Sequence, residues 1–135
     1  ENHPQDWGEI YPGVVDAFRQ LAAKCEMTII TSNQALMVRA VLETCDLGGA
    51  FTDIQGREIA GNKTEKINQI MAETDQPKKE TYFITDTIGD IREAHEAGIG
   101  AIAVTWGLHD RGMLEAENPA HICDEPEELL KILLK

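Results

Sequence analysis

The stretch that decides the fold is Tyr82–Gly100, YFITDTIGDIREAHEAGIG. Its apolar start, Tyr82–Ile84, is typical of a short buried strand. The pattern becomes helical a few residues after Asp86, and Gly98 stands where a left-handed C-terminal cap would end that helix. The apolar positions at threefold spacing are Ile91, Ala94 and Ala97. This stretch therefore predicts a strand that leads through a short turn into a helix.

Two carboxylates mark this predicted strand–helix unit. Asp86 lies at the carboxyl end of the strand, and Asp90 lies four residues later at the start of the helix. Ligands of open α/β sheets bind outside the carboxyl ends of strands, and Mg²⁺ takes one or two protein carboxylates while it keeps water and phosphate as further ligands. The alternative at this point is that Asp86 caps the turn and Asp90 complements the helix dipole.

Composition and charge limit the kinds of partner. The chain has 135 residues, of which 42% are hydrophobic and 27% charged, a balance typical of one globular domain. Its net charge of −12 argues against binding nucleic acid but allows a small phosphate ester held by a metal. No apolar run approaches the ~18 residues of a membrane span, and no signal peptide is visible. Three widely spaced cysteines favour a reducing compartment, so we expect a cytoplasmic protein without membrane partners.

The predicted helices and strands alternate, which indicates a parallel sheet with crossover helices. We expect Phe51–Gly61 to form a hairpin or an extended flap. The other expected strands are Glu26–Ile30, Ala101–Thr105 and Ala120–Cys123, and the other helices follow Tyr11-Pro12-Gly13, span Gln34–Cys45, begin at Asn62 and begin at Pro126. The side chains expected to face the core are Val15, Phe18, Leu21, Ala22 and Cys25 in the first helix and Met37, Ala40, Val41 and Cys45 in the second.

A second strand end and a helix start carry further candidate residues. Thr31 or Ser32 could offer a hydroxyl where the Glu26–Ile30 strand ends, and the N–H groups that open the next helix can bind an anion. The alternative is that Ser32 or Asn33 only caps that helix. Lys63 lies in the first turn of a helix with a predicted capping box, where a cation opposes the helix dipole. A phosphate between Lys63, Thr31 and a metal would explain this position, whereas the alternative is a solvated surface lysine.

With Thr31, Lys63, Asp86 and Asp90 in this order, the chain resembles the haloacid dehalogenase-like hydrolases, and among them the phosphoglycolate-phosphatase type. The resemblance runs from Tyr11 to the end of the chain. Its segments are IITSN (Ile29–Asn33), NKTEKI (Asn62–Ile67), ITDTIGDIREAHEAGI (Ile84–Ile99) and DEPEELL (Asp124–Leu130). It implies a Rossmann-like three-layer α/β/α fold with a mostly parallel sheet. It also implies Mg²⁺-dependent hydrolysis of a small phosphorylated metabolite through a phosphoaspartate.

The resemblance assigns a role to each matching position. Lys63 would neutralise the charge of the transferring phosphoryl group, Asp86 would hold Mg²⁺, and Asp90 would support the metal site or its water. The residues that would bind the phosphoryl group are Thr31, Ser32, Asn33 and Lys63. Thr85 stands where the family often has glycine.

The chain departs from the family pattern in one large respect. The first motif, an Asp-x-Asp-Gly-Thr loop that carries the nucleophile and the general acid/base, is absent from these residues. The cap domain is absent too, so we expect residues 1–10 to be a polar lead-in and cap remnant and residues 11–135 to be the core domain.

The absent motif would also remove the central first strand of the family, which lies between the strands that end at Thr31 and Asp86. Two open strand edges would remain, and we expect self-association, a companion chain or a rearrangement to fill the gap. The chain alone would then be inactive or impaired as a phosphatase. The alternative function is a non-catalytic module that binds Mg²⁺ or phosphate, or pairs with a partner through its open sheet edge.

Overall fold

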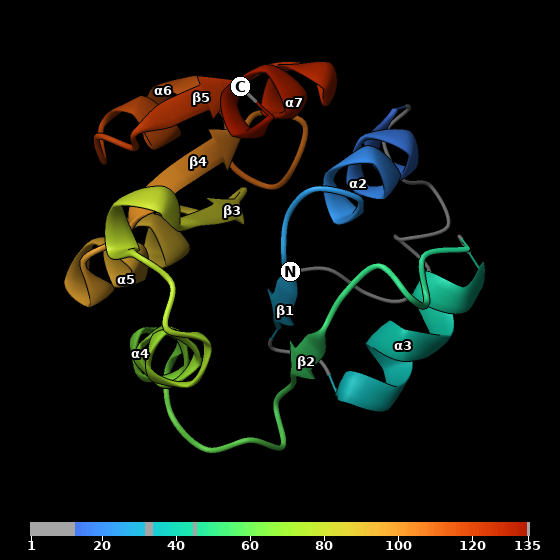
Figure 1. Ribbon diagram of the computed structural model, residues 1–135. Helices are drawn as coiled ribbons and strands as arrows, with labels where there is room; N and C mark the ends of the chain where they lie inside the picture. The colour runs from blue at the N-terminus through green and yellow to red at the C-terminus, as the bar shows by residue number, and fades with distance from the viewer. Residues whose placement is uncertain (1–12, 32–33, 45, 135) are drawn as a thin grey trace. The chain divides into compact units, whose positions relative to one another are not determined.

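Helices and strands alternate along the computed structural model, which describes residues 13–31, 34–44 and 46–134 (Figure 1). The bounds are α2 Val14–Ala22, β1 Thr28–Ile30, α3 Ala35–Thr44, β2 Asp53–Gln55, α4 Lys63–Thr74, the 3₁₀ turn η1 Lys78–Glu80, β3 Tyr82–Thr85, α5 Ile88–Ala97, β4 Gly100–Val104, α6 Arg111–Glu115, β5 His121–Cys123 and α7 Glu127–Leu133. The chain divides into two compact units, one with residues 1–60 and 126–135 and the other with residues 61–125. The expected lead-in, residues 1–10, lies outside the described residues.

All strand pairs are parallel, which confirms the predicted α/β class. In the first unit β1 pairs with β2, and in the second unit β4 lies between β3 and β5. Within the described ranges, β1 and β3 each have one strand neighbour. The structure thus has two sheets, one in each unit, and β1 and β3 each lie at an edge of their own sheet.

The prediction of a hairpin or flap over Phe51–Gly61 is wrong. The segment contains β2, which runs parallel to β1 with Ile29 opposite Ile54. Parallel strands need a crossover, and α3 supplies it. Ile54 is 6% exposed and packs with side chains of α3 and with Leu47, so burial of this side chain favours the parallel pairing over a local turn.

The predicted inward face of α3 is wrong at Met37 and Ala40, whereas Val41, which was also predicted to face inward, is half-buried. Met37 is 40% exposed and Ala40 is also exposed, whereas Val38 and Leu42 are buried against Leu47 and Ile54. The helix carries apolar residues around most of its circumference, so its own sequence does not select a face. Packing against the segment that follows the helix makes the selection. Cys45, which was also expected to face inward, lies outside the described residues.

In α2 the prediction is correct in part. Leu21 is fully buried as expected, but the other two buried positions are Val14 and Ala17. Val15 and Phe18 are half-buried and pack against the cluster of Val38, Leu42, Leu47 and Ile54. The Phe18 ring meets the Phe51 ring edge to face at 6.1 Å. Helix α2 therefore buries two adjacent stripes rather than one.

The second unit follows the sequence pattern closely. The α4 capping box forms between Asn62 and Glu65, and Gly98 ends α5 in the left-handed conformation with φ 83°. The α5 face made of Ile91, Ala94 and Ala97 is buried as predicted. Helix α5 contacts α4, β3 and β4, so it links the start of α4 to the end of β3 (Figure 1). No helix among the described residues is both long and apolar enough to span a membrane.

Candidate active site

Asp86 lies directly after the last residue of β3, as predicted. The Leu108 N–H donates to Asp86 Oδ2 at 2.8 Å, and the His109 N–H donates to the Asp86 carbonyl oxygen at 3.2 Å. The other carboxylate oxygen, Oδ1, accepts no hydrogen bond from the described part of the chain. The side chain is half-buried. Asp86 is thus held on one side and keeps an oxygen for a ligand.

The loop after β4 comes unusually close to Asp86. A Cβ placed on Gly107 would overlap the side chain of Asp86, so only glycine allows this approach. The sequence analysis expects a strand to end at Thr105, but it does not predict that the glycine two residues later meets Asp86. A glycine just after a strand of a parallel sheet was the available signal, because the ends of neighbouring parallel strands lie at one edge.

Asp90 is bound by two side chains of the second unit. Lys63 Nζ donates to Asp90 Oδ1 at 2.9 Å and to Oδ2 at 3.1 Å, and the Thr85 hydroxyl donates to Oδ2 at 2.8 Å. The Lys63 and Asp90 side chains are only 22% and 16% exposed. The structure therefore brings Lys63 to Asp90 and Thr85, although Lys63 lies 27 positions before Asp90 in the sequence.

The ion pair explains the unfavourable position of Lys63 at the start of α4. Asp90 neutralises the ammonium group, which also lies 6.0 Å from the centre of the Phe83 ring. The backbone N–H of Lys63 donates a hydrogen bond to a carboxylate oxygen of Glu93 at 3.3 Å. An acidic group at a helix N-terminus is favourable. The alternative of a solvated surface lysine is wrong.

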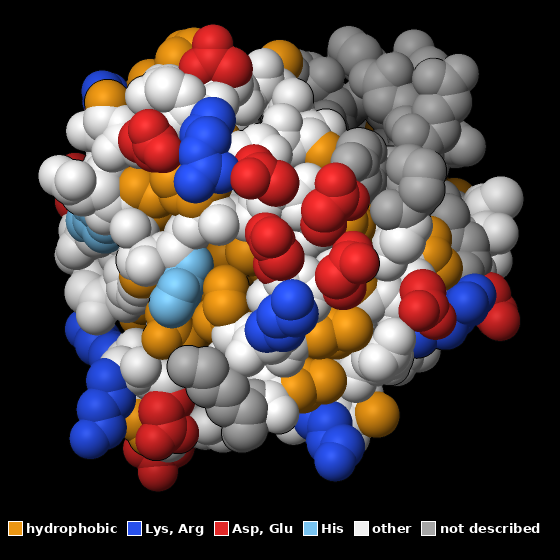
Figure 2. Space-filling view, turned by 90° about the horizontal axis from the view of Figure 1, so that it is seen from above, with side chains coloured by type: hydrophobic (Ala, Val, Ile, Leu, Met, Phe, Trp, Pro, Cys, Tyr) orange, Lys and Arg blue, Asp and Glu red, His pale blue; other side chains and the backbone are white. Residues whose placement is uncertain are grey.

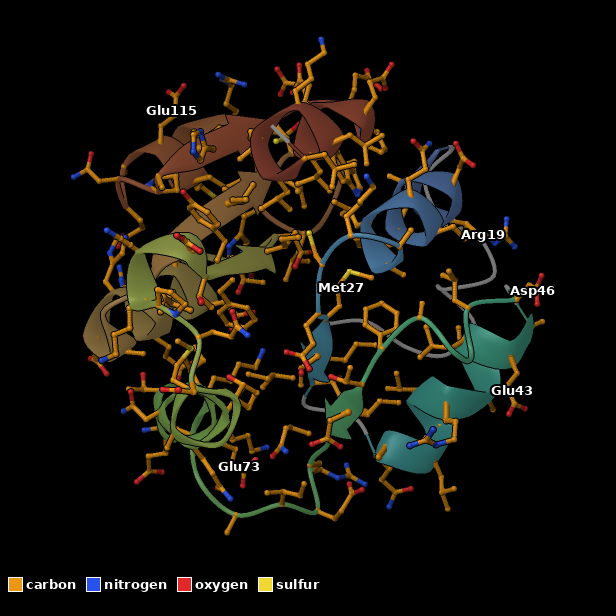
Figure 3. All side chains as sticks on the ribbon, viewed as in Figure 1. Arg19, Met27, Glu43, Asp46, Glu73 and Glu115 are labelled. Carbon is orange, nitrogen blue, oxygen red and sulfur yellow. The ribbon has the colours of Figure 1, made fainter. Side chains whose placement is uncertain are left out.

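The ion pair of Lys63 contrasts with an exposed pair in the first unit. Arg19 and Asp46 lie side by side in Figure 3, with 3.7 Å between Arg19 Nη2 and Asp46 Oδ2. Their side chains are 48% and 94% exposed, so solvent screens the attraction. The shorter and less exposed Lys63–Asp90 pair is a stronger interaction.

The turn after β3 is capped by threonines rather than by Asp86. Thr87 is the N-cap of α5 and accepts the Asp90 N–H at 3.3 Å. The Thr87 N–H donates to the Thr85 hydroxyl oxygen at 3.1 Å. The alternative in which Asp86 caps this turn is therefore wrong. Thr85, which stands where the family often has glycine, links the turn to Asp90.

Thr31 lies at the end of β1, as predicted, and belongs to the first unit. Its N–H donates to the Gln55 carbonyl oxygen at 3.0 Å. The Ala35 N–H at the start of α3 donates to the carboxylate of Glu58 at 3.3 Å, an anion in the place that a helix N-terminus favours. Ser32 and Asn33 lie outside the described residues. That Thr31 meets Lys63 and Asp86 stays a prediction.

The donor set is compatible with Mg²⁺. The described residues contain no group of three or more His, Cys, Asp or Glu side chains that could hold a metal. Mg²⁺ does not require such a group, because it uses one or two carboxylates together with water and phosphate oxygens. The available oxygen of Asp86 fits this chemistry. Both Asp90 oxygens already accept hydrogen bonds, whereas Asp86 Oδ1 accepts none from the described residues.

Two further sets of charged side chains pair with one another and have no printed contact with Lys63, Asp86 or Asp90. Arg92 donates to both carboxylate oxygens of Glu117, at 3.0 and 2.8 Å, and these hydrogen bonds lower the pKa of Glu117. Arg111 binds Asp124 and Glu115, and hydrogen bonds to Glu115 and the charge of Asp124 raise the pKa of Arg111. Figure 3 shows the Glu115 side chain pointing outward from α6. Figure 2 shows further acidic side chains at the surface, in line with the net charge of −12.

Comparisons with known proteins identify the family of this chain. The family model for haloacid dehalogenase-like hydrolases matches residues 1–104. A phosphoglycolate phosphatase of Synechococcus elongatus is 29% identical over 125 residues, which make up 91% of this chain and 58% of that protein. Phosphoglycolate phosphatase 1 of Pseudomonas aeruginosa is 27% identical over 126 residues, or 90% of this chain and 46% of that protein. The chain thus spans less than two thirds of the length of each relative.

Solved structures show the same fold. A haloacid dehalogenase-like family hydrolase of Streptococcus pneumoniae has a TM-score of 0.81 at 24% identity and covers 90% of this chain and 59% of its own. A haloacid dehalogenase superfamily hydrolase of subfamily IA from Geobacter sulfurreducens has a TM-score of 0.76 at 17% identity, covering 98% of this chain and 61% of its own. The predicted Rossmann-like α/β fold is confirmed.

Proposed function

The chain belongs to the haloacid dehalogenase-like hydrolases, and from this premise we propose that it supplies the metal- and phosphate-binding part of a Mg²⁺-dependent phosphatase. The observation that carries the proposal is the cluster at the end of β3. There Asp86 has an available carboxylate oxygen, and the Lys63–Asp90 ion pair lies in the same unit and is linked to the end of β3 through Thr85. A positive group near a metal ligand is what a phosphate ester requires.

Asp86 would hold the metal. Its Oδ2 is oriented by the Leu108 N–H, which leaves Oδ1 for Mg²⁺. When bound, Mg²⁺ would neutralise charge on the phosphate oxygens. Lys63 would bind another phosphate oxygen, with Asp90 holding the lysine in place and supporting the metal through a water. Thr31, with Ser32 and Asn33, would bind the phosphoryl group at the end of β1.

The nucleophile would come from outside these 135 residues. Covalent phosphoryl transfer needs an aligned carboxylate that is not already engaged. In this proposal Asp86 binds the metal and Asp90 pairs with Lys63, so neither carboxylate is available as the nucleophile. The chain also contains no Asp-x-Asp-Gly-Thr sequence. We infer that a strand carrying this motif, supplied by a companion segment, pairs with the open edge of β1 or β3. Alone, the chain would then be inactive or impaired.

The substrate would be a small phosphorylated metabolite. Two relatives are phosphoglycolate phosphatases, and a phosphomonoester with a small acidic part matches a site built from one metal and one lysine. Residues 11–135 would form the core domain, as the sequence pattern predicts. The net charge of −12 supports a small substrate that is bound through a metal rather than a polyanion.

The test is a complementation assay with an aryl phosphate. The chain alone should hydrolyse the ester poorly, and adding a polypeptide that carries the Asp-x-Asp-Gly-Thr strand should give Mg²⁺-dependent turnover. In that mixture Asp86→Ala should abolish turnover, whereas Asp16→Asn, a change at an exposed acid of α2, should leave it unchanged. Turnover that survives Asp86→Ala would refute the metal assignment. Binding of Mg²⁺ without turnover in any mixture would favour the non-catalytic module.

A further inference from the structure

The loop after β4 is tied to the turn after β3 by hydrogen bonds in both directions. The Leu108 N–H donates to Asp86 Oδ2 at 2.8 Å, and the His109 N–H donates to the Asp86 carbonyl oxygen at 3.2 Å. In the opposite direction, the Ile88 N–H donates to His109 Nδ1 at 3.0 Å. His109 therefore contacts the turn at two points, the carbonyl oxygen of Asp86 and the N–H of Ile88.

The imidazole of His109 satisfies a donor that the helix leaves open. Ile88 is the first residue of α5, and N–H groups in the first turn of a helix have no partner within it. The hydroxyl oxygen of the N-cap residue Thr87 accepts the N–H of Asp90 in the same turn. Two N–H groups at the start of α5 therefore have side-chain acceptors, one from the N-cap and one from the loop after β4.

The two loop residues before His109 do little to hold the loop through their own side chains. The Leu108 side chain is 56% exposed, so its own packing does little to hold the loop. Gly107 allows a close approach to Asp86 but offers no side chain to maintain it. His109 is half-buried, and its side chain accepts a hydrogen bond from the first N–H of the helix that follows the turn after β3.

We propose that His109 is a positioning residue for Asp86: its bond to Ile88 holds the loop so that the Leu108 N–H orients one oxygen of Asp86 and leaves the other open to Mg²⁺. The inference rests on the proposed function, because the orientation of Asp86 matters for Mg²⁺ only if Asp86 binds the metal. The bond itself exists without metal, so the two can be tested separately. Hydrogen-bond partners that orient a metal ligand typically change metal affinity by about 10–100-fold when removed.

The experiment uses the ¹⁵N-labelled 135-residue chain and three variants. His109→Phe keeps a ring of similar size without the acceptor. His109→Asn restores an acceptor oxygen close to the place of Nδ1. His95→Phe makes the same change at an exposed histidine of α5 that is outside the loop. For each we would measure amide hydrogen exchange of Ile88 and Leu108 without metal, Mg²⁺ affinity from amide shifts, and the thermal midpoint.

In His109→Phe we expect exchange at Ile88 and Leu108 to speed up about tenfold and Mg²⁺ affinity to fall about tenfold. His109→Asn should restore most of the protection from exchange and most of the Mg²⁺ affinity. His95→Phe should change neither the exchange rates nor the affinity. Unchanged amide exchange and unchanged Mg²⁺ affinity in a folded His109→Phe variant would overturn the inference. Faster exchange and weaker Mg²⁺ binding that persist in His109→Asn would overturn it as well. If His109→Phe does not fold, His109→Gln, with its acceptor one methylene further out, replaces it with the same expectations.

The failure of the proposed function has a different signature. A wild-type chain that binds no Mg²⁺ at millimolar concentration would overturn the metal assignment of Asp86. Amide exchange in the metal-free chain would still decide whether His109 holds the loop, because that measurement involves no ligand.

Discussion

The two units of this chain place their candidate site residues by different means. In the first unit, Thr31 follows a strand whose support is apolar, since α3 buries Val38 and Leu42 against Leu47 and Ile54. In the second unit, the candidate site residues themselves make the polar contacts that join α4, β3 and α5. Site and scaffold can therefore be changed separately in the first unit, whereas they are coupled in the second.

The largest expected effect tests the apolar support of the first unit. Leu42→Ala should lower the free energy of unfolding by about 3 kcal/mol, because Leu42 is 3% exposed and its removal leaves a cavity under α3. Leu36→Ala on the same helix should cost less than about 0.5 kcal/mol, because Leu36 is 79% exposed. Urea unfolding of both variants measures the difference. Equal losses would mean that α3 packs through another face.

The next effect tests the coupling in the second unit. Asp90→Asn should lower the free energy of unfolding by about 2 kcal/mol, because it leaves the Lys63 ammonium without its charged partner. Asp46→Asn removes the partner of Arg19 at an exposed position and should cost at most about 0.5 kcal/mol. The same urea experiment serves here. A loss for Asp90→Asn no larger than for Asp46→Asn would show that the ion pair contributes little.

A third test separates metal binding from stability in the second unit. Gly107→Ala should weaken Mg²⁺ binding by about 10–100-fold, because the added methyl group must displace Asp86 or the loop. Gly89→Ala is the matched control, since a Cβ at Gly89, within α5, has no atom within 4 Å. Calorimetric titration with Mg²⁺ gives both affinities. Equal affinities in the two variants would show that the approach of the loop to Asp86 is irrelevant to metal binding.

The smallest effect comes from the pair of Arg92 and Glu117. Because hydrogen bonds from Arg92 lower the pKa of Glu117 in the folded chain, this pair contributes stability above the ordinary pKa of a glutamate, and the contribution is lost as the pH falls through the lowered pKa. Arg92→Gln should remove that acid-dependent part and leave the metal site unchanged. Thermal unfolding from pH 7 down to pH 3, with and without added salt, measures it. A variant with the wild-type pH profile would contradict the expectation.

Local patterns predicted the second unit well because its signals lie within one helix or one turn. The capping box of Asn62 and Glu65, the buried stripe of α5 and the cap at Gly98 each depend on residues a few positions apart. The positions of Asp86 and Asp90 followed from the strand and helix around them. Pairing of Lys63 with Asp90 was not predicted, because the two residues are separated by 27 positions and either could have met another partner.

The sequence predictions are wrong where the local sequence allows two structures and contacts with distant residues decide between them. Helix α3 could have buried Met37 and Ala40 or Val38 and Leu42, and packing against Leu47 and Ile54 decided it. The segment that contains β2 could have turned back on itself, but it pairs with β1 across a helix. Gly107 and His109 were missed for the same reason, since their partners Asp86 and Ile88 are 21 positions away.

By itself, the sequence determined the alternation of helices and strands, the carboxylates at the end of one strand and the family resemblance, because these depend on periodicity and spacing along the chain. Only the tertiary structure decided which face α3 buries, that Asp90 holds Lys63, and that the loop after β4 holds Asp86. These outcomes depend on burial and hydrogen bonding between segments far apart in the chain, and such contacts exist only once the chain has folded.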